Sequence, residues 1–265
     1  MIKNLPTPKK IIQDVKKKNY VIYNNCISLI ILKKIRHFWI NYFKNNFQLK
    51  NDDLYGSNRS LGDDNYNSFR VEKKVVMFRR TEFPWNEPIH KPTQNLIFEL
   101  NQIRNLALGH NKNHGLLFNP DLEVFFSQIN NYPSGSGMMF PHKDTKKNAL
   151  LLSCMFNITS KNLDFEEGGL YLIIKNKKID IDSLMKPGSI IFYNGNLIHG
   201  VDKVVSKKGI GRIAGYPMKQ FVLSSSRTPK YIKKILRVDN AIRRRLKFKS
   251  AIEQGNSALY KNKKN

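Results

Sequence analysis

Three residues of this sequence have side chains that could hold a metal ion together: His142, Asp144 and His199. His142 and Asp144 are two positions apart, and in an extended strand residues at that spacing point to the same face and can bind one cation. His199 is the natural third ligand. Two imidazoles and one carboxylate on one face of a metal suit iron(II) and leave other coordination positions open. A structural zinc site would instead use a closed tetrahedral shell.

Arg212 adds a second chemical signal, because a buried guanidinium can hold a carboxylate through two parallel hydrogen bonds. It follows His199 across an expected hairpin that turns at residues 207–209, so we expect the two side chains to face one cavity from neighbouring strands. A lone His-x-Asp pair is weak evidence, since six histidines can produce one by chance. The metal-site interpretation depends on His199 and Arg212 standing beside that pair.

The segment from about Phe125 to Phe221 resembles the 2-oxoglutarate and iron(II)-dependent oxygenase superfamily, and its pattern is nearest to the prolyl-4-hydroxylase-like branch. The resemblance covers over a third of the chain. The shared landmarks are, in order, Tyr132-Pro133, Gly135, Pro141-His142-Lys143-Asp144, Asn157, Gly168-Gly169, Pro187-Gly188, Phe192, His199-Gly200-Val201 and Gly211-Arg212. Their order and spacing are far more specific than any one of them.

The resemblance implies that His142, Asp144 and His199 bind iron(II), and that Arg212 binds the distal carboxylate of the co-substrate 2-oxoglutarate. The other end of the keto acid would chelate the metal, and dioxygen would be the oxidant. Such a dioxygenase usually hydroxylates its substrate and releases succinate and carbon dioxide. The retained Asp144 argues against the halogenating relatives, which lack this carboxylate. No catalytic residue is predicted beyond the metal site.

Two further residues are candidates for co-substrate binding. Tyr132 stands where similar prolyl hydroxylases place a tyrosine near the co-substrate, and Asn131 adjoins it. An aromatic residue before a turn also serves as packing, so both interpretations stay open. Arg79, Arg80 and Trp85 precede the core where substrate-covering loops originate, although a solvated basic loop explains them equally well.

The substrate class stays broad. Collagen-type prolyl hydroxylases have Lys at the position of Arg212, and the oxygen-sensing type has Tyr at about the position of Met155. Nucleic-acid demethylases of the superfamily carry a second Arg six residues beyond the first, where this chain has Met218. The expected substrate is an amino acid, free or within a protein, or another small molecule.

Short apolar runs separated by turn residues predict the sheets that must position these side chains. The runs lie at 122–129, 150–158, 170–174, 189–193, 200–205 and 210–216. Turn residues at 167–169, 186–188 and 207–209 tolerate the tight backbone angles of chain reversals. This spacing indicates a β-sandwich or barrel. Together with the family resemblance, it makes the expected fold mainly β with flanking α-helices, a double-stranded β-helix of the jelly-roll, cupin-like type.

Two helices are expected to pack on one sheet. The first follows a short extended run at 20–23, has Ser28 as its N-cap, and carries apolar residues at helical spacing as far as Tyr42. The second runs from Thr93 to about Leu108, with one apolar side formed by Leu96, Ile97, Leu100, Ile103 and Leu106. Residues 51 to about 67 have the composition of a polar surface loop.

The domain prediction is an oxygenase domain at 1–223, with its jelly-roll core at about 116–223, followed by a basic helix and tail at 224–265. The net charge of +26 favours phosphate-rich partners, but lysine and asparagine are abundant throughout, as the codon usage of an AT-rich genome would produce. The alternative function is therefore a nucleic-acid or anionic-surface binding protein on the same fold, motivated by the basic helix from Lys233 to Lys249.

The sequence also predicts a cytoplasmic protein without a membrane span. No stretch approaches the ~20 apolar residues that cross a bilayer. The apolar run from Leu29 to Leu32 is too short for a signal peptide. Cys26 and Cys154 lie far apart in apolar segments, so each is expected to be a small buried residue in a reducing compartment.

Overall fold

The computed structural model describes residues 1–46, 65–116, 123–144 and 152–221. In these ranges the helices are α1 (Pro8–Lys18), α2 (Leu29–Asn45) and α3 (Lys91–Ala107). The strands are β1 (Tyr20–Tyr23), β2 (Asn65–Val71), β3 (Lys74–Glu82), β4 (Glu123–Tyr132), β5 (Met139–His142), β6 (Leu152–Asn157), β7 (Glu167–Ile174), β8 (Lys177–Asp180), β9 (Ile190–Asn194), β10 (Ile198–Val205) and β11 (Arg212–Phe221).

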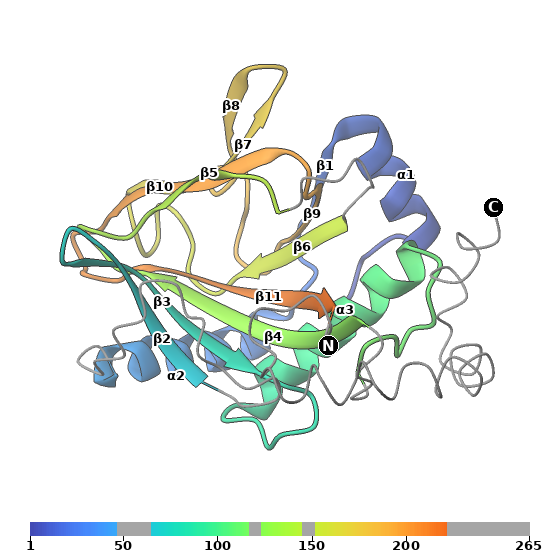
Figure 1. Cartoon of the computed structure of the whole chain (residues 1–265), viewed down its shortest axis with the longest axis horizontal. Coiled ribbons are helices and arrows are strands. Elements are labelled where there is room, and N and C mark those ends of the chain that lie inside the picture. The colour runs from blue at the N-terminus through green and yellow to red at the C-terminus, as the bar shows by residue number, and fades with distance from the viewer. Residues whose placement is uncertain (47–64, 117–122, 145–151, 222–265) are drawn as a thin grey trace, which may run out of the picture.

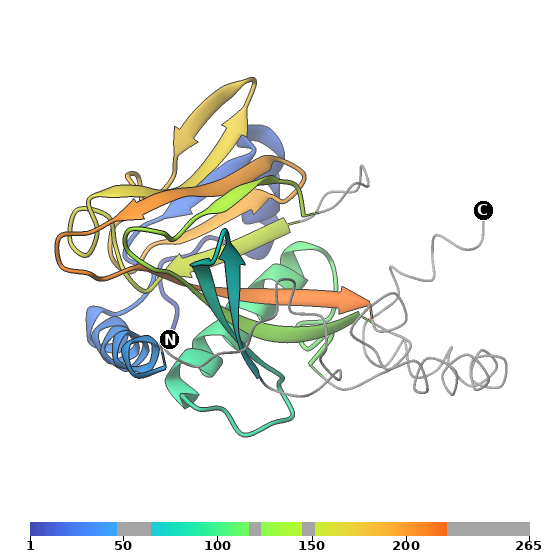
Figure 2. The ribbon, with the colours of Figure 1, turned by 60° about the vertical axis from the view of Figure 1, so that its left-hand side comes forward.

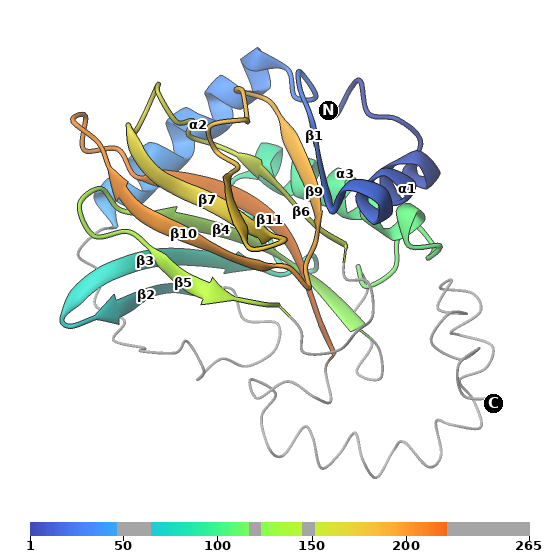
Figure 3. The same ribbon diagram turned by 90° about the horizontal axis from the view of Figure 1, so that it is seen from above.

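The strands form two antiparallel sheets that lie face to face (Figure 1). The larger sheet has seven strands in the order β1-β9-β6-β11-β4-β3-β2, and the smaller has four in the order β5-β10-β7-β8. Seen from above, β10 and β7 cross over the strands of the larger sheet (Figure 3). This arrangement is the predicted double-stranded β-helix, with the chain passing repeatedly from one sheet to the other.

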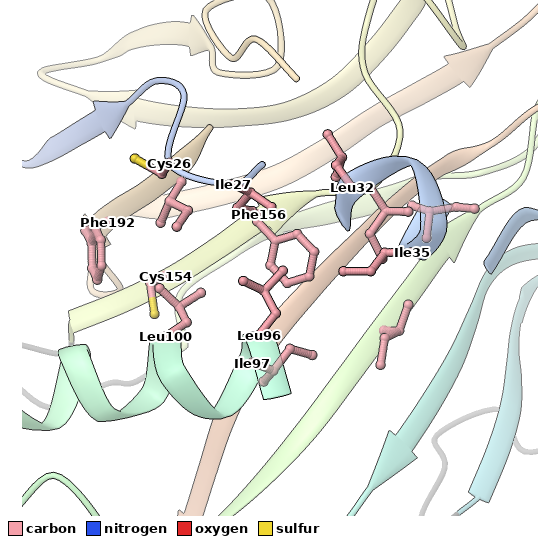
Figure 4. Close-up of a cluster of buried hydrophobic side chains, with 14 of the residues drawn as sticks. Cys26, Ile27, Leu32, Ile35, Leu96, Ile97, Leu100, Cys154, Phe156 and Phe192 are labelled. Atoms are coloured by element: carbon pink, nitrogen blue, oxygen red, sulfur yellow. The ribbon is translucent and has the colours of Figure 1, made fainter. Parts of the chain in front are cut away.

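The larger sheet is covered by helices on the face that points away from the smaller sheet (Figure 2). Strand residues at every second position point to that face. They pack against apolar residues of α2 and α3 (Figure 4). The labelled members of this cluster are Cys26, Ile27, Leu32, Ile35, Leu96, Ile97, Leu100, Cys154, Phe156 and Phe192. Both cysteines are buried and free, as predicted.

The predictions of the two N-terminal helices are confirmed with one exception. Helix α2 begins directly after Ser28, and α3 begins at Lys91, slightly before the predicted Thr93. Leu106 was expected on the apolar side of α3 but is 47% exposed, because it lies about a third of a turn around the helix from the buried Leu100.

The hairpin formed by β2 and β3 was not predicted. Strand β3 pairs with β4 and so extends the larger sheet, and it contains Arg79 and Arg80, which had suggested a basic loop. Asparagine and arginine interrupt the apolar alternation that marks a strand, and this hides the hairpin in the sequence. Helix α1, which packs beside α3 and β1, was also missed.

The predicted basic helix (Lys233 to Lys249), the tail and most of the predicted polar loop lie outside the described residues. Within the described ranges, none of the helices combines the length and the apolar character that crossing a bilayer requires.

Candidate metal centre and its surroundings

His142, Asp144 and His199 meet where β5 ends and β10 begins. Oδ1 of Asp144 lies 3.8 Å from Nε2 of His142 and 3.5 Å from Nε2 of His199. The three ligand atoms all lie within 4.8 Å of one another, and no other group of three in the described ranges offers a comparable set. His199 is 7% exposed, Asp144 27% and His142 41%, so the site is enclosed on one side and open on another.

An irregularity in strand pairing brings His142 to the face of His199. The register pairs His199 with His142 and Val201 with Met139, so two steps along β10 match three steps along β5. In a regular strand Met139 and His142 would point to opposite faces. The extra residue of this bulge lets both lie opposite residues that share one face of β10.

Asp144 reaches the site from a bend and not from a strand. Strand β5 ends at His142, which corrects the expectation that the His-x-Asp pair lies within one extended strand. The backbone N–H of Asp144 donates to the carbonyl of Gly195 at 3.2 Å. Its Oδ2 accepts from the hydroxyl of Ser153 at 3.2 Å. These contacts fix one carboxylate oxygen and leave Oδ1 facing the histidines.

Both histidines are held by backbone carbonyls. Nδ1 of His142 lies 2.9 Å from the carbonyl oxygen of Phe140, and Nδ1 of His199 lies 2.9 Å from that of Leu197. Because a carbonyl only accepts, the hydrogen-bond pattern assigns the ring proton to Nδ1 in each case. Each Nε2 then presents a lone pair to the centre, which is the tautomer of a metal-ligating histidine.

The electrostatics of the site favour an ionised carboxylate. Burial by itself would raise the pKa of Asp144, but the hydrogen bond and charge of His199 hold that pKa below its ordinary value. Burial likewise would lower the pKa of His199, and Asp144 outweighs it and raises that pKa. Asp144 therefore places an anionic oxygen beside two ring nitrogens, and a divalent cation there would take the place of the proton that the raised pKa favours on His199.

Arg212 lies in the other sheet. We expected it on a strand paired with that of His199, but β10 belongs to the four-stranded sheet and β11 to the seven-stranded sheet. The turn at 207–209 therefore carries the chain from one sheet to the other. Arg212 and His199 belong to facing sheets and not to a single hairpin.

Arg212 is fully buried and bound to a buried carboxylate that the sequence did not single out. Its Nε lies 2.5 Å from Oδ2 of Asp182, and its Nη2 lies 3.2 Å from Oδ1. Burial by itself would lower the pKa of Arg212, but the negative charge of Asp182 has the larger effect, so that the pKa lies above its ordinary value. Asp182 sits in a short polar stretch where Asp180 and Ser183 make a surface turn, so nothing in the sequence signals its burial.

Tyr193 lies beside the metal-binding triad, and Tyr216 lies beside Arg212. The Tyr193 ring lies edge-on to His199, with centroids 5.5 Å apart. Burial raises the pKa of Tyr193 well above its ordinary value, and the charges of Asp144 and Tyr216 add to this. The hydroxyl of Tyr216 in turn accepts from Nη1 of Arg212 at 3.1 Å. Tyr193 and Tyr216 also pack in one apolar cluster, so the triad and Arg212 border a common interior.

The structure brings Tyr132 to Arg212 but not Asn131. Tyr132 pairs with Arg212 in the β4–β11 register, and the guanidinium carbon lies 5.7 Å from the centre of its ring. Asn131 pairs with Ile213 and Phe78, which both belong to the helix-covered cluster, so it points away from the interior.

Asn130 takes the interior position instead, because it lies two residues from Tyr132 on β4 and residues at that spacing in a strand share a face. Its Oδ1 accepts from Nε of Arg79 at 3.2 Å. The period of two along β4 was the signal that could have identified Asn130 from the sequence.

The donor set fits iron(II) and 2-oxoglutarate. Two imidazole nitrogens and one carboxylate oxygen are oriented by second contacts to Phe140, Leu197 and Ser153, as metal ligands usually are. Asp182 covers the Nε side of the Arg212 guanidinium, and Nη1 with the Tyr216 hydroxyl remains as a pair of polar groups for the distal end of a keto acid.

No protein-family model and no curated protein matches this sequence. Solved structures do match. A putative oxygenase from Shewanella oneidensis is similar at 15% identity and a TM-score of 0.53, over 87% of this chain and 93% of that one. A prolyl hydroxylase from Trichoplax adhaerens, solved in complex with a hypoxia inducible factor oxygen degradation domain peptide fragment, gives 12% and 0.50, over 83% and 90%.

The non-heme alpha ketoglutarate dependent carbocyclase SnoK from nogalamycin biosynthesis gives 12% identity and a TM-score of 0.52, over 82% of this chain and 87% of that one. At these identities the similarity shows the fold. The chain has the double-stranded β-helix of the 2-oxoglutarate and iron(II)-dependent oxygenases, as its sequence pattern predicted.

Proposed function

We propose that this protein is an iron(II)- and 2-oxoglutarate-dependent dioxygenase in which His142, Asp144 and His199 hold the metal. One observation carries the proposal. Nε2 of both imidazoles faces the same oxygen of Asp144 while a carbonyl holds each Nδ1. That arrangement leaves one side of the centre open to further ligands, which a closed structural site would not do.

Different residues around the metal centre bind the co-substrate, orient the carboxylate ligand and exclude water. Iron(II), when bound with 2-oxoglutarate and dioxygen, supplies an oxidation that releases succinate and carbon dioxide. Arg212 and Tyr132 bind the distal half of the keto acid from β11 and β4. Ser153 holds the Asp144 carboxylate, and Tyr193 closes the apolar side next to His199, where it excludes water.

Hydroxylation of an amino acid, free or within a protein, or of another small molecule is the reaction we propose. The reason is that Asp144 occupies the third ligand position, so that a halide has no place there. The alternative, binding of nucleic acid or an anionic surface, depends on residues 233–249, which lie outside the described ranges.

The test of the metal and co-substrate assignment is an anaerobic titration of the apo-protein with iron(II) and then 2-oxoglutarate. We expect the visible charge-transfer band of the chelate in the wild type and none in His199→Ala. His37→Ala, which removes an exposed histidine on α2, is the matched control and should keep the band. Absence of the band in the wild type would refute the oxygenase proposal.

The hydroxylase assignment needs a separate measurement. Succinate release should rise above its uncoupled background with an accepted substrate, and the product should gain the mass of one oxygen atom. If the product instead lost two hydrogens with the same succinate yield, the enzyme would be an oxygenase of another reaction type. If no candidate substrate raised succinate release while a nucleic acid bound in a salt-dependent manner, the alternative function would be favoured.

A further inference from the structure

Arg212, Asp182 and Asn157 form a closed polar network between the sheets. The side chains of Arg212 and Asp182 are both 0% exposed. The Asp182 carboxylate accepts from Nε and Nη2 of Arg212, from the amide of Asn157 at 2.8 Å and from the backbone N–H of Leu170 at 2.7 Å. The amide oxygen of Asn157 accepts from Nη2 of Arg212 at 3.2 Å, which closes the network.

This network cancels the charge of the arginine. One carboxylate held on two nitrogens of one guanidinium gives a pair with no net charge. Charges in a buried position act strongly because little water screens them, so the compensation matters more here than it would at the surface. A ligand carboxylate that reaches Arg212 meets hydrogen-bond donors but no uncompensated positive charge from this pair.

The network also decides which part of the guanidinium a ligand can use. Asp182 covers the side formed by Nε and Nη2, and the sulfur of Met155 lies 3.5 Å from Nη2. Nη1 points to the hydroxyl of Tyr216 at 3.1 Å. Tyr216 is only partly buried, whereas Arg212 is fully buried. The Tyr216 hydroxyl accepts from Arg212 and can donate its own proton to a second acceptor. Nη1 and the Tyr216 hydroxyl together offer two donors in one direction.

We propose that Asp182 is a positioning residue that neutralises Arg212 and turns its Nη1 toward Tyr216, so that the site selects its keto acid by hydrogen bonds and not by charge. The inference rests on the proposed function. It names the co-substrate class as 2-oxo acids whose distal group accepts two hydrogen bonds, whether that group is an anionic carboxylate or a neutral ester. Tyr216 becomes a binding residue for that distal group.

The test compares 2-oxoglutarate with its 5-methyl ester, which keeps the acceptor oxygens and removes the distal charge. Iron(II)-loaded protein is titrated anaerobically with each, and the charge-transfer band gives the two Kd values. In the wild type we expect the Kd values to differ by less than about tenfold, which corresponds to ~1.4 kcal/mol. In Asp182→Asn the preference for 2-oxoglutarate should rise by at least about tenfold, because the uncompensated charge of Arg212 then attracts the dianion.

Two further variants separate positioning from simple loss of structure. Asp180→Asn removes a surface carboxylate that binds Lys161 and Ser183, and it should leave the preference unchanged. Tyr216→Phe should weaken both ligands by a similar factor, since both lose the same donor. The thermal shift caused by 2-oxoglutarate should be larger in Asp182→Asn than in the wild type, because the ligand then replaces the missing carboxylate.

A wild type that prefers 2-oxoglutarate over the ester by more than about a hundredfold, or an Asp182→Asn preference no higher than that of the wild type, would overturn the inference. If Asp182→Asn does not fold, the wild-type Kd ratio and Tyr216→Phe decide the matter. If both ligands produce the charge-transfer band but the ratio of their Kd values is not the expected one, this inference alone is contradicted. No band with either ligand in the wild type counts against the proposed function itself.

Discussion

His142 lies directly opposite His199 in the register of β5 and β10, and their ring centroids are 4.4 Å apart. Strand β5 is an edge strand of its sheet, with β10 as its partner. A metal ion held by both imidazoles would therefore cross-link an edge strand to its neighbour. Metal binding should then change the stability of the protein as well as its activity.

Metal loading should raise the melting temperature. Cobalt(II), used as an air-stable substitute for iron(II), should stabilise the wild type by ~2.7 kcal/mol at a hundred times its Kd, as mass action requires. A chelator should reverse the shift, and His142→Ala should abolish it. Differential scanning fluorimetry measures the effect, with His37→Ala as the variant that keeps it. An undiminished shift in His142→Ala would show that the metal binds elsewhere.

Ser153 should contribute to metal affinity without touching the metal. Its hydroxyl donates to Oδ2 of Asp144 at 3.2 Å and so orients the carboxylate. Loss of such a contact typically weakens metal binding by about tenfold or more. We expect this for Ser153→Ala in a calorimetric titration with cobalt(II). Ser183→Ala removes a hydroxyl that binds the surface Asp180 and should leave the Kd unchanged; equal Kd values in both variants would exclude the role of Ser153.

Gly200 should be needed for the close approach of β5 to β10. A Cβ at this position would lie 2.7 Å from the carbonyl oxygen of Met139 and 2.5 Å from the hydroxyl of Tyr171. Gly200→Ala should therefore lower the free energy of unfolding by about 1–3 kcal/mol. Adding Tyr171→Phe should restore only part of that loss, because it removes the hydroxyl contact but keeps the ring carbon Cζ, which would lie 2.9 Å from the new Cβ. Urea denaturation measures both, and a Gly200→Ala protein as stable as the wild type would contradict the packing seen here.

The two leucines of α3 should respond very differently to truncation. Leu100 is buried in the cluster between α3 and the larger sheet, whereas Leu106 is exposed. Leu100→Ala should cost about 2–5 kcal/mol of unfolding free energy, and Leu106→Ala no more than about 0.5 kcal/mol. Urea denaturation of the pair tests the placement of α3. Similar losses in the two variants would mean that the helix packs through another side.

Both cysteines should resist thiol reagents in the folded protein. Burial raises the pKa of Cys26 and Cys154 to about 11 each. Because the thiolate is the reactive form, a raised pKa leaves almost none of it at pH values well below 11, and packing blocks access as well. A chromogenic disulfide reagent should detect almost no thiol in the native protein and two thiols after denaturation. Fast reaction of either cysteine in the native state would contradict its burial.

Much of the fold was predictable because its elements carry strong local signals. Ser28 stands before apolar residues at helical spacing, and α2 begins directly after it. The runs that became β4, β6, β7, β9, β10 and β11 are rich in branched and aromatic residues and are bounded by turns. The three predicted metal ligands also lie together, because their order along the chain matches a pattern that this fold positions.

Other features depended on tertiary structure that no local pattern records. The bulge between β5 and β10 decides the face of His142, and it arises from pairing between strands far apart in the chain. The burial of Asp182 follows from the position of Arg212 on the facing sheet. Asn131 was named because it adjoins Tyr132, although the alternation of a strand places Asn130 on the same face as Tyr132.

Strand β1 pairs with β9, and beside this pair the Ser189 hydroxyl donates to the Asn24 amide oxygen across 165 residues of sequence. Strand β1 thus has no partner until β9 has been synthesised, and at that point His142 is already part of the chain whereas His199, on β10, is not. Contacts of such long sequence separation slow folding, because the loop between them must close first. We therefore expect slow, late assembly of this sheet during synthesis, with apolar strand surface open to chaperones until β1 pairs with β9.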